Sequence, residues 1–118
     1  MEKKLVTKHL LLRCKSSSDK LTDVNAIKKF LDFMPGKIGM KKIIKPKVLL
    51  YNNCEKINHG VSGFVMIAES HISIHTYPNR KVFYMDVFSC KDFDVEKTKA
   101  EINKFFDSKV IKNRVCTR

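Results

Sequence analysis

The sequence predicts an α+β fold, a two-layer domain in which two helices cover one face of a largely antiparallel sheet. Three observations support this prediction. Two segments carry apolar residues at helical spacing. Several short segments either alternate between apolar and polar residues or are continuously apolar, as strands are, and turn residues separate the segments. The chain has 118 residues, 43% of them hydrophobic, which is sufficient for one core, so we expect a single domain over 1–118.

The first strand and the first helix are expected near the start of the chain. Residues 6–13 include three consecutive leucines and predict a strand. Thr22 can cap a helix that runs from residue 23 to about residue 34, because apolar residues recur there every three or four positions. The Pro-Gly pair at 35–36 is expected to end this helix.

The rest of the chain predicts five strands and a second helix. A strand is expected over 43–51, where Pro46 favours a sheet edge or a bulge. Further strands are expected at 61–68, 71–77, 82–88 and 109–116. Alternation within 71–77 assigns one polar face to His71, Ser73, His75 and Tyr77. Asp94 can cap a helix whose inward face carries Val95, Thr98, Ile102, Phe105 and Phe106.

Charge and cysteine usage narrow the class of protein. The formal net charge is +12, but only four of the 24 basic residues are arginines, and the lysines are scattered, which favours a solvated surface over a nucleic-acid partner. No charged-then-apolar leader and no run of membrane-spanning length is present. None of the four cysteines forms a C-x-x-C pair, so we expect a cytoplasmic protein without a metal site.

One segment, 60–90, concentrates residues that can do chemistry. Serine hydroxyls, histidine rings, a carboxylate and a thiol lie close together in this segment, which makes it a candidate site for nucleophilic or acid–base chemistry. These residues are Ser62, Glu69, Ser70, His71, Ser73, His75 and Cys90. Polar residues on the open side of an antiparallel sheet are often only solvated, and a buried cysteine often only packs. The residue types alone therefore fit either a catalytic site or an ordinary sheet face.

The amino-acid sequence of this segment resembles that of a known family. Gly-Val-Ser-Gly at 60–63, Ala-Glu-Ser-His-Ile-Ser-Ile-His-Thr at 68–76 and Asp-Val-Phe-Ser-Cys at 86–90 are similar to the short prokaryotic S-adenosylmethionine decarboxylases. The resemblance extends from Lys8 to the last helix. It implies a proenzyme that cleaves its own backbone, and a dimer of processed protomers packed as an αββα sandwich.

The resemblance also implies roles for particular residues. Ser70 Oγ would attack the Glu69 carbonyl, His75 would remove the Ser70 α-proton, and Ser62 would assist the processing. The products would be 1–69 and 70–118, the second beginning with a pyruvoyl group made from Ser70. That group would condense with a substrate amine and accept the electrons of decarboxylation, while Cys90 would return a proton. Ser70 as an uncleaved strand residue and Cys90 as a packing residue remain the alternatives.

The substrate side departs from the family pattern. Lys56 stands where an aromatic ring is usual, and Asn79 stands where a ribose-binding glutamate usually follows the aromatic and proline, here Tyr77 and Pro78. A stacked ring is worth about 1–3 kcal/mol and a charge-assisted hydrogen bond about 1.5–3 kcal/mol. We therefore favour a small basic amino acid, L-ornithine or L-arginine, over S-adenosylmethionine. Glu55 is a candidate for holding its distal cation.

Functions of another class remain open at this point. The chain could be an inert regulatory paralogue, because its nucleoside contacts are altered, or a basic nucleic-acid-binding protein, because of its charge. Intact Ser70, His75 and Cys90 argue against the inert paralogue, which has no chemical need for them. The sequence does not fix the oligomeric state or regulation by polyamines.

Overall fold

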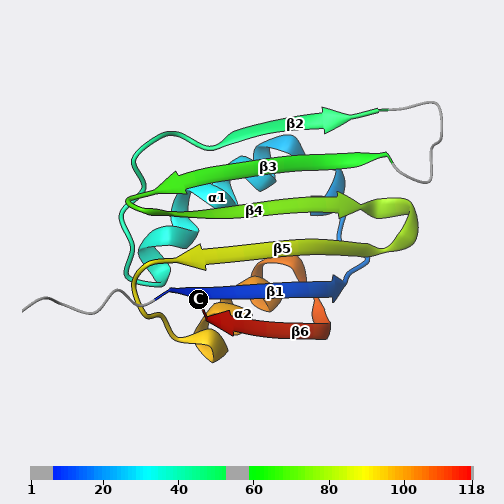
Figure 1. Ribbon diagram of the computed structural model, residues 1–118. Coiled ribbons are helices and arrows are strands. Elements are labelled where there is room, and N and C mark those ends of the chain that lie inside the picture. Colours follow the sequence, from blue (N-terminus) through cyan, green and yellow to red (C-terminus); the bar gives the residue numbers. More distant parts are fainter. Residues whose placement is uncertain (1–6, 53–58, 118) are drawn as a thin grey trace, which may run out of the picture.

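The computed structural model describes residues 7–52 and 59–117, which form a six-stranded antiparallel sheet with two α-helices against one face (Figure 1). The strands are β1 (Lys8–Lys15), β2 (Lys47–Tyr51), β3 (Gly60–Ile67), β4 (Ser70–Tyr77), β5 (Val82–Ser89) and β6 (Lys109–Thr117). The helices are α1 (Val24–Lys37) and α2 (Val95–Phe106), and short 3₁₀ turns cover Asp19–Thr22 and Pro78–Arg80. The strand order is β2-β3-β4-β5-β1-β6, and the predicted α+β class is confirmed.

The core lies between the helices and one face of the sheet. The fully buried side chains of the helices are Ile27, Phe30, Leu31, Met34, Thr98, Ile102 and Phe106. The ring of Phe106 lies 4.9 Å from that of Phe30 and 4.7 Å from that of Phe83, which joins α1, α2 and β5. Burial raises the pKa of the Cys14 thiol on β1 to about 12, so this cysteine is a protonated core residue at neutral pH.

The start and the end of α1 differ from the prediction. Asp23, not Thr22, is the N-cap, because its carboxylate accepts the backbone N–H groups of Asn25 and Ala26. Thr22 lies in the preceding 3₁₀ turn, where its hydroxyl donates to the carbonyl of Asp19. The helix also continues through Pro35 to Lys37, although a proline removes one helical hydrogen bond and its ring crowds the carbonyl four residues earlier.

The predicted strand over 43–51 is shorter in the structure. Strand β2 begins at Lys47, directly after Pro46, which has no N–H to donate to a ladder. β2 is an edge strand, as Pro46 suggested. Upstream, the backbone of Ile43 instead donates to the Met66 carbonyl, and Lys42 forms an isolated bridge with Ile67. The Asp94 cap of α2 is confirmed, since its carboxylate accepts the Lys97 N–H.

The sheet face away from the helices, called the open face below, carries the side chains that alternate with the buried ones. Cross-strand pairing arranges them in rows. The first row, at the end where β4 begins, contains Met66, His71, Phe88, His9 and Cys116. The second contains Phe64, Ser73, Asp86, Leu11 and Arg114. The third contains Leu49, Ser62, His75, Tyr84, Arg13 and Lys112.

Large apolar side chains on the open face remain accessible, among them Leu49, Phe64, Met66 and Tyr84, each between 42% and 61% exposed. Phe64 and Met66 follow each other on the open side of β3, and adjoining exposed apolar side chains on one sheet face are typical of an interaction surface. In the described part of the chain, no helix is both long and apolar enough to cross a membrane.

Candidate active site

The peptide bond between Glu69 and Ser70 lies in the turn that joins β3 to β4. Ile67 pairs with Ser70, so Ala68 and Glu69 form a two-residue hairpin loop. Glu69 has a φ of 63°, in the left-handed region that favours glycine. A non-glycine residue held there costs about 1–2 kcal/mol, so backbone strain adjoins the bond that the resemblance marks for cleavage.

This strain predicts the effect of a substitution. In a Ser70→Ala background, which keeps the chain intact, Glu69→Gly should raise the free energy of unfolding by about 0.5–1 kcal/mol, because glycine adopts positive φ without the steric cost. Ala68→Gly is the matched control. Ala68 has no positive φ, so its replacement should only lower stability. Urea unfolding measures both changes, and equal losses in the two variants would contradict strain at Glu69.

Ser70 is in contact with the predicted proton donor through the backbone. The N–H of Cys90 donates to Ser70 Oγ over 3.1 Å, and both residues are partly buried. Cys90 directly follows β5, whose last residues lie beside the start of β4. The nucleophile and the thiol residue, 20 positions apart, are therefore adjacent in space.

Ser62 and His75 form a second pair. They are direct cross-strand partners on β3 and β4, and a hydrogen bond of 2.9 Å joins Ser62 Oγ to His75 Nδ1. When Nδ1–H donates to the hydroxyl, Nε2 keeps a free lone pair and can take a proton. The histidine is exposed on the open face, so this nitrogen is accessible to a group that approaches from outside the sheet.

The structure does not bring these two pairs together within one chain. Ser70 and His75 lie five residues apart on the same strand, which places their Cα atoms about 17 Å from each other at ~3.3 Å per residue. No side-chain rotation closes such a gap. His75 therefore cannot reach the α-proton of Ser70 in its own chain, although the sequence had placed both in one site.

The remaining polar residues of β4 have packing partners. The His71 ring stacks on Phe88, with centroids 5.4 Å apart, and the same phenylalanine meets His9 edge-on at 5.8 Å. Ser73 pairs across the sheet with Asp86, whose carboxylate lies 3.9 Å from His9 Nε2. These contacts agree with a structural role for His71.

The residues expected to bind substrate lie mainly at the other end of β4 from Ser70. Tyr77 ends this strand and meets the Tyr84 ring edge-on at 5.7 Å, and Asn79 follows in the 3₁₀ turn. Glu55 and Lys56 lie outside the described residues. Within its own chain, Asn79 is thus remote from the bond expected to yield the pyruvoyl group.

The glycines of the Gly-Val-Ser-Gly motif have a packing explanation. A Cβ on Gly60 would lie 1.8 Å from the carbonyl oxygen of Thr76, and one on Gly63 would lie 3.0 Å from a methyl group of Leu31 on α1. The Thr76 hydroxyl accepts the Val61 N–H over 2.8 Å and donates to the Leu21 carbonyl over 2.7 Å. The motif therefore sets the β3–β4 pairing that aligns Ser62 with His75.

Sequence reasoning missed the turn that holds Cys90. The buried Ser89 hydroxyl donates to the carbonyl of Lys91 over 2.5 Å and accepts the N–H of the same residue over 2.9 Å. The Lys91 ammonium donates to the Gly39 carbonyl over 3.3 Å, which joins this turn to the segment after α1. A small hydroxyl residue directly before the cysteine was the available signal.

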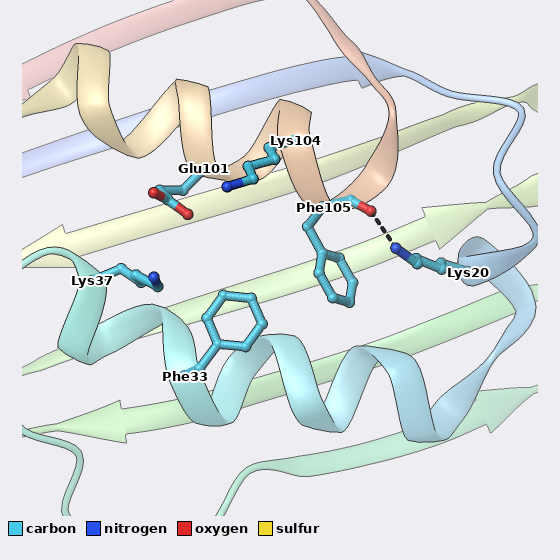
Figure 2. A pocket seen from close by; sticks show the side chains of 6 residues that line it. All are labelled: Lys20, Phe33, Lys37, Glu101, Lys104 and Phe105. Carbon is cyan, nitrogen blue, oxygen red and sulfur yellow. Dashed lines mark hydrogen bonds between the residues drawn. The ribbon is translucent and has the colours of Figure 1, made fainter.

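Among the hollows that the described residues line, two lie on opposite sides of the sheet. One, of about 320 Å³, lies between α1 and α2 and is lined by Lys20, Phe33, Lys37, Glu101, Lys104 and Phe105 (Figure 2). Lys20 there donates to the Phe105 carbonyl over 2.7 Å. This hollow is on the helix layer, away from the open face. The other, of about 340 Å³, extends over β1, β5 and β6, with Arg13, Tyr84, Asp86 and Arg114 among its lining residues.

Comparisons with known proteins agree with the resemblance. The family model described as S-adenosylmethionine decarboxylase matches residues 8–118. Proteins named S-adenosylmethionine decarboxylase proenzyme are similar. The one from Prochlorococcus marinus is 33% identical over 75% of this chain and 68% of its own length. The one from Thermodesulfovibrio yellowstonii is 34% identical over 70% of this chain and 57% of its own length. The one from Archaeoglobus fulgidus is 51% identical over 40% of this chain and 44% of its own length, so the match spans less than half of that relative.

Proposed function

The chain belongs to the S-adenosylmethionine decarboxylase family, and from that premise we propose that it cuts itself between Glu69 and Ser70 and then decarboxylates an amino acid. The observation that carries the proposal is the geometry at this bond. Glu69 is held in a left-handed conformation beside a serine whose Oγ accepts the Cys90 N–H. The pyruvoyl group expected from Ser70 would supply the sink for the electrons that loss of carbon dioxide leaves behind.

The proposed self-cleavage can be written as three steps in which every bond and proton is accounted for. Ser70 Oγ attacks the Glu69 carbonyl carbon, the C–N bond breaks, and the Ser70 nitrogen takes the hydroxyl proton, which leaves an ester. A base then removes the Ser70 α-proton, and Cβ–Oγ breaks with Oγ leaving in the Glu69 carboxylate. Hydrolysis of the dehydroalanine releases ammonia and leaves the pyruvoyl group. The 3.1 Å bond to Oγ supports a role for the Cys90 N–H in stabilising this departing oxygen.

The base for the second step comes, in this proposal, from another copy of the chain. His75 carries the accessible imidazole, but it is about 17 Å along β4 from Ser70. Two sheets packed face to face lie about 10 Å apart, and a two-fold axis that runs across the strands over the second row would turn the first row of one copy onto the third row of the other. Ser70 directly precedes His71 of this first row, so its backbone would then lie beside His75 of the partner copy.

The open face supports this homodimer. Its exposed apolar side chains include Leu49 on β2, Phe64 and Met66 on β3, and Tyr84 on β5. Burial against a second copy would remove this surface from water at about 25 cal/mol for each square ångström. The same packing would bring Tyr77 and Asn79 of one copy toward Ser70 of the other. The residues expected to bind substrate and the expected pyruvoyl group would then share one site.

For the substrate we favour L-ornithine or L-arginine, with S-adenosylmethionine as the alternative that the names of the relatives support. Asn79 lacks the carboxylate expected to bind a ribose. On the described part of the open face, Asp86 is the carboxylate that borders a hollow, and a distal ammonium group needs such a partner. Every one of these substrates would place the enzyme in polyamine synthesis.

One experiment tests the reaction and the substrate together. Intact-mass measurement of the purified protein should give two fragments split at Glu69–Ser70, and carbon dioxide release should be greater with L-ornithine or L-arginine than with S-adenosylmethionine. Asp86→Asn should raise KM for the amino acid by roughly tenfold or more, through loss of a charge-assisted contact. A single 13.7 kDa chain after long incubation would contradict the proposal, and release from S-adenosylmethionine alone would contradict only the substrate.

A further inference from the structure

Ser89 is a polar residue in an apolar place. It is the last residue of β5, its side chain is 0% exposed, and it lies on the sheet face that the helices cover. A buried hydroxyl costs free energy unless it forms hydrogen bonds, so its partners reveal what it stabilises. Both partners belong to one residue, Lys91.

The two hydrogen bonds close a tight ring around Cys90. The Ser89 hydroxyl donates to the Lys91 carbonyl and accepts the Lys91 N–H, so the residues on each side of Cys90 are fixed to each other. Cys90 occupies the apex of this turn and has few ways to rotate. Its N–H can therefore maintain the 3.1 Å contact with Ser70 Oγ.

We infer that Ser89 is a positioning residue, whose hydroxyl holds the Cys90 turn in the geometry needed for self-cleavage and for the later return of a proton. This inference rests on the proposed function. Ser89 touches neither the scissile bond nor the substrate, and it acts through Cys90.

The chain contains a matched control for this hydroxyl. Ser16 is 3% exposed, its Oγ donates to the Phe106 carbonyl over 2.7 Å, and it accepts the Ser18 N–H over 3.1 Å. It thus loses one donated and one accepted backbone bond on replacement by alanine, as Ser89 does. Ser16 lies just beyond the opposite end of β1 from the Cys90 turn, so the control separates stability from positioning.

The test compares the rate of self-cleavage in freshly refolded wild type, Ser89→Ala, Ser89→Thr and Ser16→Ala, followed by mass spectrometry. Ser89→Ala should cleave at least tenfold more slowly, because a displacement of about 1 Å at a reacting group costs roughly a hundredfold. Ser89→Thr keeps the hydroxyl and should stay within about threefold of wild type. Ser16→Ala should lower Tm by a similar amount and still cleave at the wild-type rate. If Ser89→Ala does not fold, Ser89→Cys keeps the volume with weaker hydrogen bonds and should also cleave slowly.

The processed fractions supply a second readout. After correction for the cleaved fraction, Ser89→Ala should show kcat reduced about tenfold with KM within twofold of wild type, because Cys90 acts in proton return and not in binding. A loss of general stability would not lower kcat while leaving KM nearly unchanged. Equal slowing in Ser16→Ala, or a wild-type cleavage rate in a folded Ser89 variant, would overturn the role of Ser89 alone. An intact wild-type chain would overturn the proposed function as well.

Discussion

Ser70→Ala should leave the chain whole, with one species of about 13.7 kDa less one oxygen atom, while the wild type yields two fragments. Cleavage needs an oxygen that attacks the Glu69 carbonyl and later leaves with it, and Ser70 Oγ is the group that the hairpin turn holds at this bond. Intact-mass spectrometry over several days measures the result.

Ser73→Ala is the control for that experiment. Ser73 lies on the same strand, three residues further on, and its side chain belongs to the open face. Its replacement should leave cleavage complete. Fragments from Ser70→Ala would show that hydrolysis at this turn does not need the serine, and an intact Ser73→Ala chain would show that the defect is one of folding or association instead.

Much of the fold could be predicted because local patterns dominate it. The alternation in 71–77 gave the correct face for the residues that it covers, and Asp94 capped the second helix as expected. The first helix was less certain at its ends. Thr22 and Asp23 are both good caps, and only the packing of the preceding 3₁₀ turn decides between them. Pairing of β1 between β5 and β6 is non-local, and no local pattern predicts it.

The resemblance named the members of the candidate site, which stay a prediction, but it did not give their arrangement within one chain. A two-residue turn at 68–69 already places residue 62 opposite residue 75, so this register could have been read from the sequence. Ser70 and His75 lie five residues apart on one strand, which argues against one site within one chain. The contact between Cys90 and Ser70 depends on how β5 pairs with β4, and the sequence alone does not set that pairing.

The separation of the two pairs determines which chain should supply each group. In the proposed homodimer, each site combines Ser70 and Cys90 of one copy with Ser62 and His75 of the other. A Ser70→Ala dimer has no nucleophile in either site. A His75→Ala dimer has no base in either site and should stop at the ester, so hydroxylamine should then split the chain.

A mixed dimer of these two variants should restore one site out of two. We expect the His75→Ala chain to be cleaved completely and to gain its pyruvoyl group, because its Ser70 faces the intact His75 of the Ser70→Ala copy. The Ser70→Ala chain should remain whole. Two different affinity tags, with co-expression and purification through both, isolate this species, and mass spectrometry identifies which chain was cut.

The outcome assigns the histidine to one chain or the other. If His75 acted within its own chain, the mixed dimer would contain no site with both groups, and neither chain would progress beyond the ester. Cleavage of His75→Ala without its partner would show that this imidazole is not the base. The cis arrangement requires a residue about 17 Å away to remove a proton, whereas the trans arrangement needs only two copies packed through the open face, where Phe64, Met66 and Tyr84 are exposed. The mixed dimer should therefore cleave in the pattern expected for a shared site.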